Sequence, residues 1–314
     1  MMRKAAVASA ASALVLLGAQ PAAAWCQMTS EAGYTPPGEP CATEGVPLAW
    51  ERRCISYALD AEGSLDLDLE TVRQEAETAF AAWTGAACPG GGTVDIEVAQ
   101  LDQTATCDQD EFNSNGGNVN VIAFVRDWEE RELEGVDRIF ALTTVWHDTS
   151  SGEILDVDML VNEQQGPYAV CPEAGCTSSG RTPVDLRNVL THEAGHFFGI
   201  GHTDVEISSE IDEEDWPTMT TTAARGVTFM RTLADDDVDA LCSVYPPGSL
   251  PGSCADEEAF APIGGYDLDC TDDGGGGRCS VAGVPGRPAG APAGLLLGFA
   301  LITALRRARR APRS

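Results

Sequence analysis

The residues best suited to chemistry lie in one eleven-residue segment, His192-Glu-Ala-Gly-His-Phe-Phe-Gly-Ile-Gly-His202. His192 and His196 are four residues apart, so on a helix their rings share one face and can hold one metal ion. Gly199 can end the helix in a left-handed turn that brings His202 back to the same ion. Three imidazoles leave the fourth position of Zn²⁺ open for water, which Glu193 can reach without being a ligand. The segment therefore predicts a zinc site that activates water, with Glu193 as the general base.

A helix has to carry the first two of these histidines. The sequence predicts that it begins with Thr182 as the N-cap and Pro183 at the first helical position, two residue types suited to those places. Asp185 then lies in the first turn, where a negative charge is favoured. We expect this helix to run to about Phe198 and to stop at Gly199.

A second helix is predicted over residues 67–83, where Val72, Ala76, Phe80 and Trp83 recur every three or four positions. Shorter segments, most of them apolar or alternating and bounded by turn residues, predict strands. The predicted strands are residues 54–59, 93–101, 119–125, 141–146 and 154–161, and a last helix is predicted at residues 234–244.

The segment 192–202 resembles the zinc-binding signature of the metzincin endopeptidases, and residues 48–246 resemble the matrixin branch. The resemblance implies an α+β, zincin-like fold. It would have a twisted, mixed, mostly parallel five-stranded sheet with two long helices on one side, zinc on the second helix, and a C-terminal helix. It also implies a Met-turn beneath the zinc. Met219 is the first candidate for that methionine and Met230 the second, while an ordinary core methionine is the alternative for both.

The chain departs from typical matrixins in ways that concern latency. The loop between His202 and Met219 is longer and very acidic, no cysteine-switch motif is present, and residues 25–50 are short for a prodomain. The activation route therefore stays open. No tyrosine lies two residues after Met219, which argues against the astacin and serralysin branches.

The resemblance implies a zinc-dependent endopeptidase that hydrolyses peptide bonds of protein or peptide substrates. A substrate would add to the edge strand at residues 141–146, with Thr143, Thr144 and Val145 nearest the site. The alternative is a non-catalytic surface or adhesion module that zinc merely stabilises. An intact Glu193 and an open fourth zinc position disfavour that alternative.

Charge excludes one class of partner. The 314 residues include 19 basic and 49 acidic ones, a net charge of −30, so the surface repels phosphate backbones and nucleic-acid binding is excluded. Such an acidic body offers many oxygen ligands, and matrixins commonly bind calcium, so structural Ca²⁺ is possible beside the catalytic Zn²⁺. A solvated, solubilising surface is the alternative explanation. We expect His147 to lie at a strand end and face solvent.

The N-terminus predicts export. Arg3 and Lys4 precede an apolar stretch over residues 5–18 and the small residues Ala22-Ala23-Ala24. That order is typical of a secretory signal peptide over residues 1–24, whereas a short buried helix would not explain the basic start.

The C-terminus predicts a surface-sorting tail. Cys279 is followed by an apolar run over residues 289–305 and by Arg306-Arg307-Ala308-Arg309-Arg310. This order resembles the myxobacterial C-terminal sorting tail, the MYXO-CTERM type, which implies a sorting protease as a partner. A plain C-terminal membrane anchor is the alternative. Either way the body lies at the cell surface or outside the cell, touching a membrane only through the tail.

Eleven cysteines in an exported chain predict a disulfide framework of up to five bridges, once Cys279 is set aside. Cys171 and Cys176 are near enough to close a small loop, and Cys254 and Cys270 are expected to pair locally. The predicted organisation is then a signal peptide at 1–24, an N-terminal arm at 25–50, a matrixin-like zinc protease domain at 51–247, a Gly- and Asp-rich stalk at 248–278 and a sorting or membrane tail at 279–314.

Overall fold

The computed structural model describes residues 25–31, 40–106, 111–131, 138–204, 216–268 and 292–301. The predicted signal peptide lies outside these residues, and so do Cys279 and the arginine cluster at 306–310.

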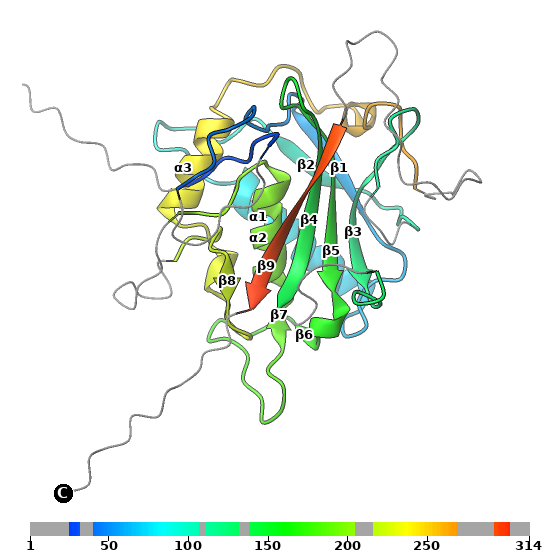
Figure 1. Cartoon of the computed structure of the whole chain (residues 1–314), viewed down its shortest axis with the longest axis vertical. Coiled ribbons are helices and arrows are strands. Elements are labelled where there is room, and N and C mark those ends of the chain that lie inside the picture. The colour runs from blue at the N-terminus through cyan, green and yellow to red at the C-terminus, as the bar shows by residue number, and fades with distance from the viewer. Residues whose placement is uncertain are drawn as a thin grey trace, which may run out of the picture.

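One mixed sheet organises the molecule (Figure 1). Its strand order is β2-β1-β3-β5-β4-β9-β8. The pairs β1–β2, β1–β3, β3–β5 and β8–β9 are parallel, and β4 is antiparallel to both β5 and β9. The strands of this sheet are β1 (Cys54–Leu59), β2 (Glu97–Gln100), β3 (Asn120–Val125), β4 (Ile139–Asp148), β5 (Ile154–Asn162), β8 (Thr222–Ala223) and β9 (Pro292–Leu301). A separate short pair is formed by β6 (Tyr168–Ala169) and β7 (Val184–Asp185).

All five predicted strands are present, but in the described part of the chain the sheet has seven strands instead of five. The two additional strands, β9 and β8, continue it beyond β4. The prediction that residues 141–146 form an edge strand is therefore wrong for this structure, because the C-terminal strand pairs with the outer side of β4. Residues 292–301 were expected inside a membrane segment and instead form β9. Among the described residues, no helix is both long and apolar enough to cross a membrane.

Two helices cover one face of the sheet (Figure 1). They are α1 (Leu69–Thr84) and α2 (Leu186–Phe197), while α3 (Asp235–Val244) comes later in the chain. Strand alternation sorts the side chains: Tyr57 and Met159 join the core under the helices, and Val121 and Leu160 join a smaller core on the other face. The Trp83 indole N–H, which donates to the carbonyl of Thr191 at 2.8 Å, fastens α1 to α2.

Helix α2 begins later than predicted. Its N-cap is Asp185, whose carboxylate accepts the N–H of Asn188 at 2.8 Å, and not Thr182. The residues before it are extended because Val184 donates to the carbonyl of Pro167, and the carbonyl of Thr182 accepts from Arg225. The backbone groups of Thr182 and Val184 therefore form hydrogen bonds with distant residues, and the helix begins only after them.

Both ends of the described body pack more closely than predicted. In the N-terminal arm, Met28, Leu48 and Trp50 are buried in the main core, and Cys26 is bonded to Cys41. The predicted stalk is wrong over residues 254–268, because this segment runs along the body. Its contacts are hydrogen bonds from Arg52 to the carbonyls of Ala259 and Ala261, from Ser56 to that of Phe260, and from Asn118 to that of Gly265.

Four disulfides join described residues. The predicted small loop Cys171–Cys176 is confirmed, and Cys88 is bonded to Cys242. The expected local pair of Cys254 and Cys270 is wrong, because Cys254 is bonded to Cys54 across 200 residues of sequence. Cys107 and Cys270 lie outside the described residues.

Candidate metal centre

Helix α2 and the turn after it bring three histidines together. His192 and His196 lie one turn apart on α2, and both side chains are fully buried. The chain leaves the helix at Gly199, whose φ is +77°; a Cβ there would lie 2.6 Å from the carbonyl oxygen of Leu48. Glycine is therefore required at this turn, which returns His202 to the other two rings. One ligand atom from each histidine lies within 4.8 Å of the others.

The imidazoles are oriented as metal ligands. The Nδ1 atom of His192 lies 2.6 Å from the carbonyl oxygen of Thr218, and that of His196 lies 2.9 Å from the carbonyl oxygen of Ile200. Each Nδ1–H donates to a carbonyl, which leaves Nε2 with its lone pair. The buried Nε2 of His196 has no hydrogen-bond partner among the described residues.

The spacing of the nitrogens fits one ion. The Nε2 atoms of His192 and His202 are 3.2 Å apart. Two ligands that each lie about 2.0–2.1 Å from a tetrahedral Zn²⁺ are separated by about 3.3 Å. The observed 3.2 Å between the two Nε2 atoms is close to this value, so the donor set fits zinc.

Burial also keeps these rings neutral. It lowers the pKa of His196 to about 4 and, together with the neighbouring histidines, holds the pKa values of His192 and His202 well below their usual range. A neutral imidazole is the form that binds a metal ion. The cluster is therefore ready for an ion without first losing protons near neutral pH.

Glu193 lies beside the three ligands and is fully buried. The hydroxyl of Thr143 on β4 donates to its Oε2 at 2.5 Å, and its Oε1 has no hydrogen-bond partner among the described residues. Burial raises the pKa of Glu193 to about 8, although the bond from Thr143 acts in the opposite direction. The carboxyl group thus has one oxygen fixed by the sheet and one oxygen available for a further partner.

The two candidate methionines lie in different places. A Cβ added to Gly195 on α2 would lie 2.1 Å from the sulfur of Met219, so Met219 lies directly against the helix between the first two histidines. The sulfur of Met230 instead accepts from Asn188 at 3.4 Å, near the start of α2. Of the two, only Met219 lies beneath the histidine cluster.

Asp237 on α3 holds the turn that contains Met219. Its carboxylate accepts the N–H of Thr218 at 2.7 Å and that of Met219 at 3.1 Å. The carbonyl of the same Thr218 faces His192. Asp237, in the first turn of α3, therefore links this helix to the histidine cluster.

A comparison with known families places this arrangement. The model of the matrixin family, Peptidase_M10, matches residues 49–246. The chain belongs to the matrixin family. With its three-histidine zinc-binding group it is a zinc metalloendopeptidase. No curated protein matches the chain. The disulfides and the matrixin domain fit an extracellular protein.

The predicted substrate-edge residues of this matrixin lie on β4 next to the metal centre. Thr143 touches Glu193, and Thr144 and Val145 follow it along the strand. On one side these residues pair with Met159, Asp158 and Val157 of β5, and on the other with Leu297, Leu296 and Leu295 of β9. The sequence predicted an extended peptide at this edge, and in the structure a segment of the same chain lies there.

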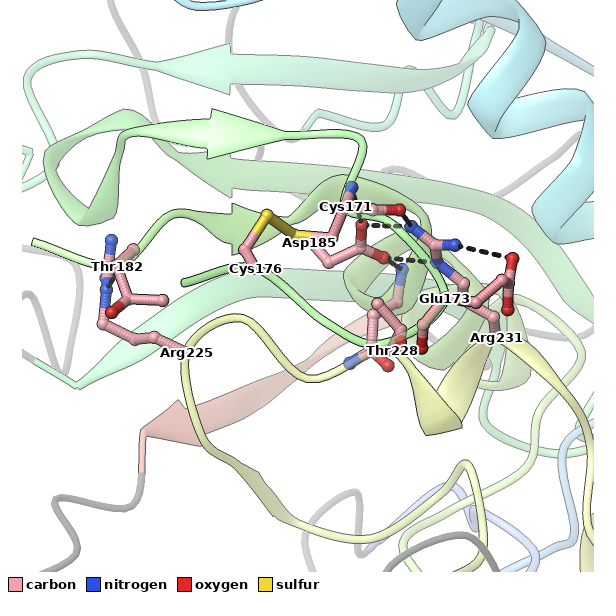
Figure 2. The surroundings of a disulfide bond; sticks show 9 residues. Cys171, Glu173, Cys176, Thr182, Asp185, Arg225, Thr228 and Arg231 are labelled. Carbon is pink, nitrogen blue, oxygen red and sulfur yellow. Dashed lines mark hydrogen bonds and ion pairs between the residues drawn. A yellow bond between two sulfur atoms is a disulfide. The ribbon is translucent and has the colours of Figure 1, made fainter. Parts of the chain in front are cut away.

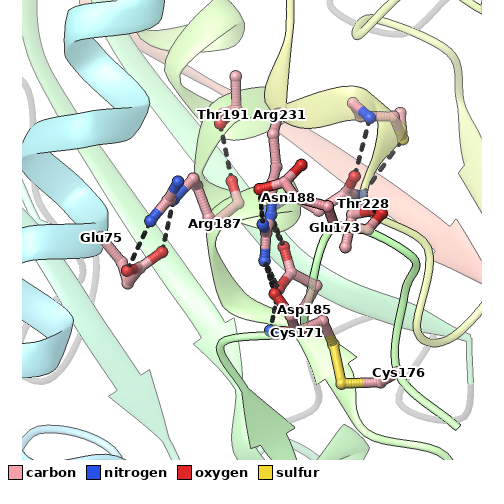
Figure 3. A network of polar contacts seen from close by, with 11 residues as sticks. Glu75, Cys171, Glu173, Cys176, Asp185, Arg187, Asn188, Thr191, Thr228 and Arg231 are labelled. Atoms are coloured by element: carbon pink, nitrogen blue, oxygen red, sulfur yellow. Dashed lines mark hydrogen bonds and ion pairs between the residues drawn. A yellow bond between two sulfur atoms is a disulfide. The ribbon is translucent and has the colours of Figure 1, made fainter. Parts of the chain in front are cut away.

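A buried ion pair fixes the segment after Met219 to the start of α2. Asp185 accepts from the Nη2 of Arg231 at 2.5 Å and from its Nε at 2.8 Å, and Arg231 also donates to the carbonyl of Cys171 at 2.7 Å (Figure 3). On the other side of α2, Arg187 makes a bidentate pair with Glu75 of α1 at 2.6 and 2.9 Å. The zinc-binding helix is therefore held from both sides by arginine–carboxylate pairs.

The Cys171–Cys176 loop supports the same segment (Figure 2). The N–H of Cys176 donates to the carbonyl of Gly226 at 2.8 Å, and the hydroxyl of Thr228 donates to the carbonyl of Glu173 at 2.9 Å. An open pocket of about 880 Å³ lies along this segment, with Cys176, Arg225, Thr228 and Phe229 among its lining residues.

His147 differs from the expectation. It is fully buried, not solvent-facing, and its Nε2 has no hydrogen-bond partner among the described residues. Within these residues, the three site histidines form the only group of three or more His, Cys, Asp or Glu residues close enough to hold a metal ion. His147 is therefore not part of a second cluster of that kind.

Proposed function

We propose that this matrixin is exported and hydrolyses peptide bonds of extended substrates at the His192–His196–His202 site, with Glu193 as the general base. The observation that carries the proposal is the pairing of a buried three-imidazole cluster with an adjacent buried carboxyl group. A structural zinc site is closed by its own ligands, whereas three ligands and a neighbouring carboxylate are typical of a hydrolytic site.

The Nε2 atoms of the three histidines would hold Zn²⁺. When bound, the ion would polarise the scissile carbonyl and make a water molecule acidic near neutral pH. Thr218 and Ile200 orient two of the ligands through their carbonyls, and Met219 supports the helix from below. Met219 is thus a positioning residue.

Glu193 would move the proton. Its Oε1 takes a proton from the attacking water and then delivers it to the nitrogen of the leaving amine, while Thr143 holds Oε2. The proton that Glu193 gains in the first step is the one that it delivers in the second, so the carboxylate is regenerated.

The backbone of β4 at Thr143, Thr144 and Val145 would bind the substrate in place of β9, which pairs with this edge in the structure. The N–H and C=O groups that β9 occupies could then pair with any extended peptide, so recognition there would need no particular side chain. Export through residues 1–24 and surface sorting through residues 279–314 complete the proposal, and structural Ca²⁺ on the acidic body remains part of it.

The test is hydrolysis of a quenched-fluorescent peptide library by the purified protein, with and without a zinc chelator. Chelation should abolish turnover, and added Zn²⁺ should restore it. Glu193→Gln should lower kcat by about 10²–10⁴-fold while zinc content stays near one ion per chain. Turnover near the wild-type rate in Glu193→Gln would contradict the assigned role. Zinc-loaded protein without any turnover would favour a zinc-stabilised surface module.

A further inference from the structure

We propose that strand β9, in the chain's own C-terminal segment, occupies the substrate cleft and competes there with other peptides. The proposal rests on the proposed function only in taking β4 as the substrate-binding edge. It assigns to residues 292–301 a regulatory role that neither the family match nor the zinc site implies.

The placement of β9 carries the inference. Its backbone is antiparallel to β4, with Leu297 opposite Thr143, Leu296 opposite Thr144 and Leu295 opposite Val145. Thr143 is the residue whose hydroxyl touches Glu193. Opposed Cα atoms in an antiparallel pair are about 4.5–5.5 Å apart. The Leu297 backbone therefore lies directly beside Thr143, the β4 residue that contacts the general base.

The other edge of β9 is also paired. Ala300 and Leu301 pair in parallel with Thr222 and Ala223 of β8, a strand that begins three residues after Met219. β9 thus lies between a strand that touches Glu193 and a strand that follows the turn beneath the histidines (Figure 1). A cleft between two strand edges binds an extended substrate in the same way, by backbone pairing on both sides of the peptide.

The covalent connection between β9 and the body favours binding of β9 in the cleft. Residues 269–291 join β9 to the segment that runs along β1, so binding is intramolecular. A short tether gives an effective concentration on the order of mM, whereas peptide substrates bind with KM values of about 1 μM–1 mM. Peptides in solution would therefore face a competitor that dilution does not remove. This sequence contains no cysteine-switch motif, and β9 would provide another means of restraint.

The first experiment measures occupancy without using activity. Amide hydrogen exchange is followed by mass spectrometry in the full-length Glu193→Gln chain, which should not cut its own tail. Residues 292–301 and the outer edge of β4 should be protected. Leu296→Pro with Leu297→Pro should remove that protection, because neighbouring residues direct their N–H groups to opposite edges and one of the two must face β4.

A matched control carries the same number of prolines outside the strand, Ala282→Pro with Gly283→Pro, and should keep the protection. Exchange in β1, β3 and β5 should be unchanged in every variant, which excludes general unfolding. Full exposure of residues 292–301 in the parent chain would overturn the proposal. So would equal protection in the parent and the Leu296→Pro, Leu297→Pro variant.

The second experiment uses chains with Glu193 intact and a quenched-fluorescent peptide. The Leu296→Pro, Leu297→Pro variant should raise kcat/KM by about tenfold or more, mainly through a lower KM, and the control variant should not. An unchanged kcat/KM in an active enzyme would contradict the competition. If none of the variants hydrolyses any peptide, the proposed function fails, and the exchange experiment still decides whether β9 occupies the cleft.

Discussion

At the scale of single residues, the hydroxyl of Thr143 is the contact that most directly tunes the site. It donates a hydrogen bond to the Glu193 carboxyl group, and it comes from the sheet and not from the zinc-binding helix. The substitution Thr143→Val keeps the shape and removes this bond. We expect kcat to fall about tenfold, which corresponds to a loss of about 1.4 kcal/mol in transition-state stabilisation, while zinc content stays unchanged.

The pH profile separates positioning by Thr143 from a merely structural effect. Because the bond from Thr143 lowers the pKa of Glu193, its loss should move the acidic limb of the kcat/KM profile to higher pH. Thr220→Val is the control, since the Thr220 hydroxyl is buried without a hydrogen-bond partner among the described residues. A profile with the same acidic limb in Thr143→Val would contradict this role.

Asp156 on β5 gives a prediction about stability and pH. Both of its carboxylate oxygens are buried without a hydrogen-bond partner among the described residues, and burial together with Glu111 raises its pKa well above the usual range. The folded state thus binds the proton more tightly than the unfolded state does. The contribution of Asp156 to the free energy of unfolding therefore decreases as pH rises above about 4, the unfolded pKa.

Asp156→Asn removes that ionisation and should raise Tm at pH 8 while having little effect near pH 4. Calorimetry across this range, with EDTA present, measures the difference between the two proteins. A wild-type protein that is more stable than the variant at pH 8 in the presence of Ca²⁺ would instead indicate that Asp156 holds a cation.

At the scale of secondary-structure elements, close packing of α2 against the turn below it fixes the histidines. A Cβ at Gly195 would lie 2.1 Å from the sulfur of Met219 and 2.8 Å from Cζ2 of Trp83. Alanine at a helix interior normally stabilises by about 1 kcal/mol relative to glycine. Overpacking of a buried site costs about 1–3 kcal/mol, so the expected sign is reversed here.

Gly195→Ala should therefore destabilise the protein, and it should also weaken zinc retention because the displaced turn carries the carbonyl that orients His192. Urea unfolding and metal analysis measure the two effects. Gly90→Ala is the control, since a Cβ at Gly90 would meet no atom within 4 Å. If the Gly195→Ala protein is more stable than the wild type and keeps its full zinc content, Met219 and Trp83 can move aside at little cost and the prediction fails.

Local sequence patterns predict some helix boundaries and miss others. Local periodicity located α1 to within about two residues, because this helix has one apolar face that must be buried. The helix predicted at residues 234–244, before Pro246-Pro247, likewise matches the observed bounds of α3 closely. The start of α2 was missed because Thr182 and Pro183 have good capping chemistry, but Arg225 binds the carbonyl of Thr182 and the next two residues, Val184 and Asp185, pair with β6. No pattern at residues 182–185 reveals those distant partners.

The site was predictable in part for a similar reason. His192, Glu193, His196 and His202 carry their spacing in the sequence, since helix geometry and one glycine turn suffice to place them together. The supporting contacts from Thr143, Thr218 and Asp237 come from other elements. Their residue types are common on any protein, so only the fold identifies them.

At the scale of the whole molecule, distant parts of the chain converge on the two ends of the sheet. The bond between Cys54 and Cys254 holds the segment after α3 against β1, although 200 residues separate them. The tail returns to the opposite end, where β9 pairs with β4. An apolar run of this length suits a strand as readily as a short membrane segment, so the sequence pattern alone does not reveal the pairing of residues 292–301 with β4.

Removal of residues 279–314 tests this organisation. The disulfide-bonded body, as far as it is described, ends at Leu268 and contains the histidine cluster, Glu193 and all four disulfides. The truncated chain should therefore fold, bind zinc and appear in the medium as a soluble protein. Its kcat/KM should equal that of the Leu296→Pro, Leu297→Pro variant, because both lack a paired β9.

The measurement is fractionation of cells that express either form, with zinc content and peptide hydrolysis followed in each fraction. The full-length form should be found at the cell surface, or in the medium as a product cut near Cys279, if the tail also sorts the protein. An identical distribution of the two forms would contradict the sorting role. A truncated chain that is misfolded would show instead that β9 is needed to complete the sheet beside β4. In that case the strand would be part of the body's core architecture, and its competition with substrates would have to be judged from the proline variants alone.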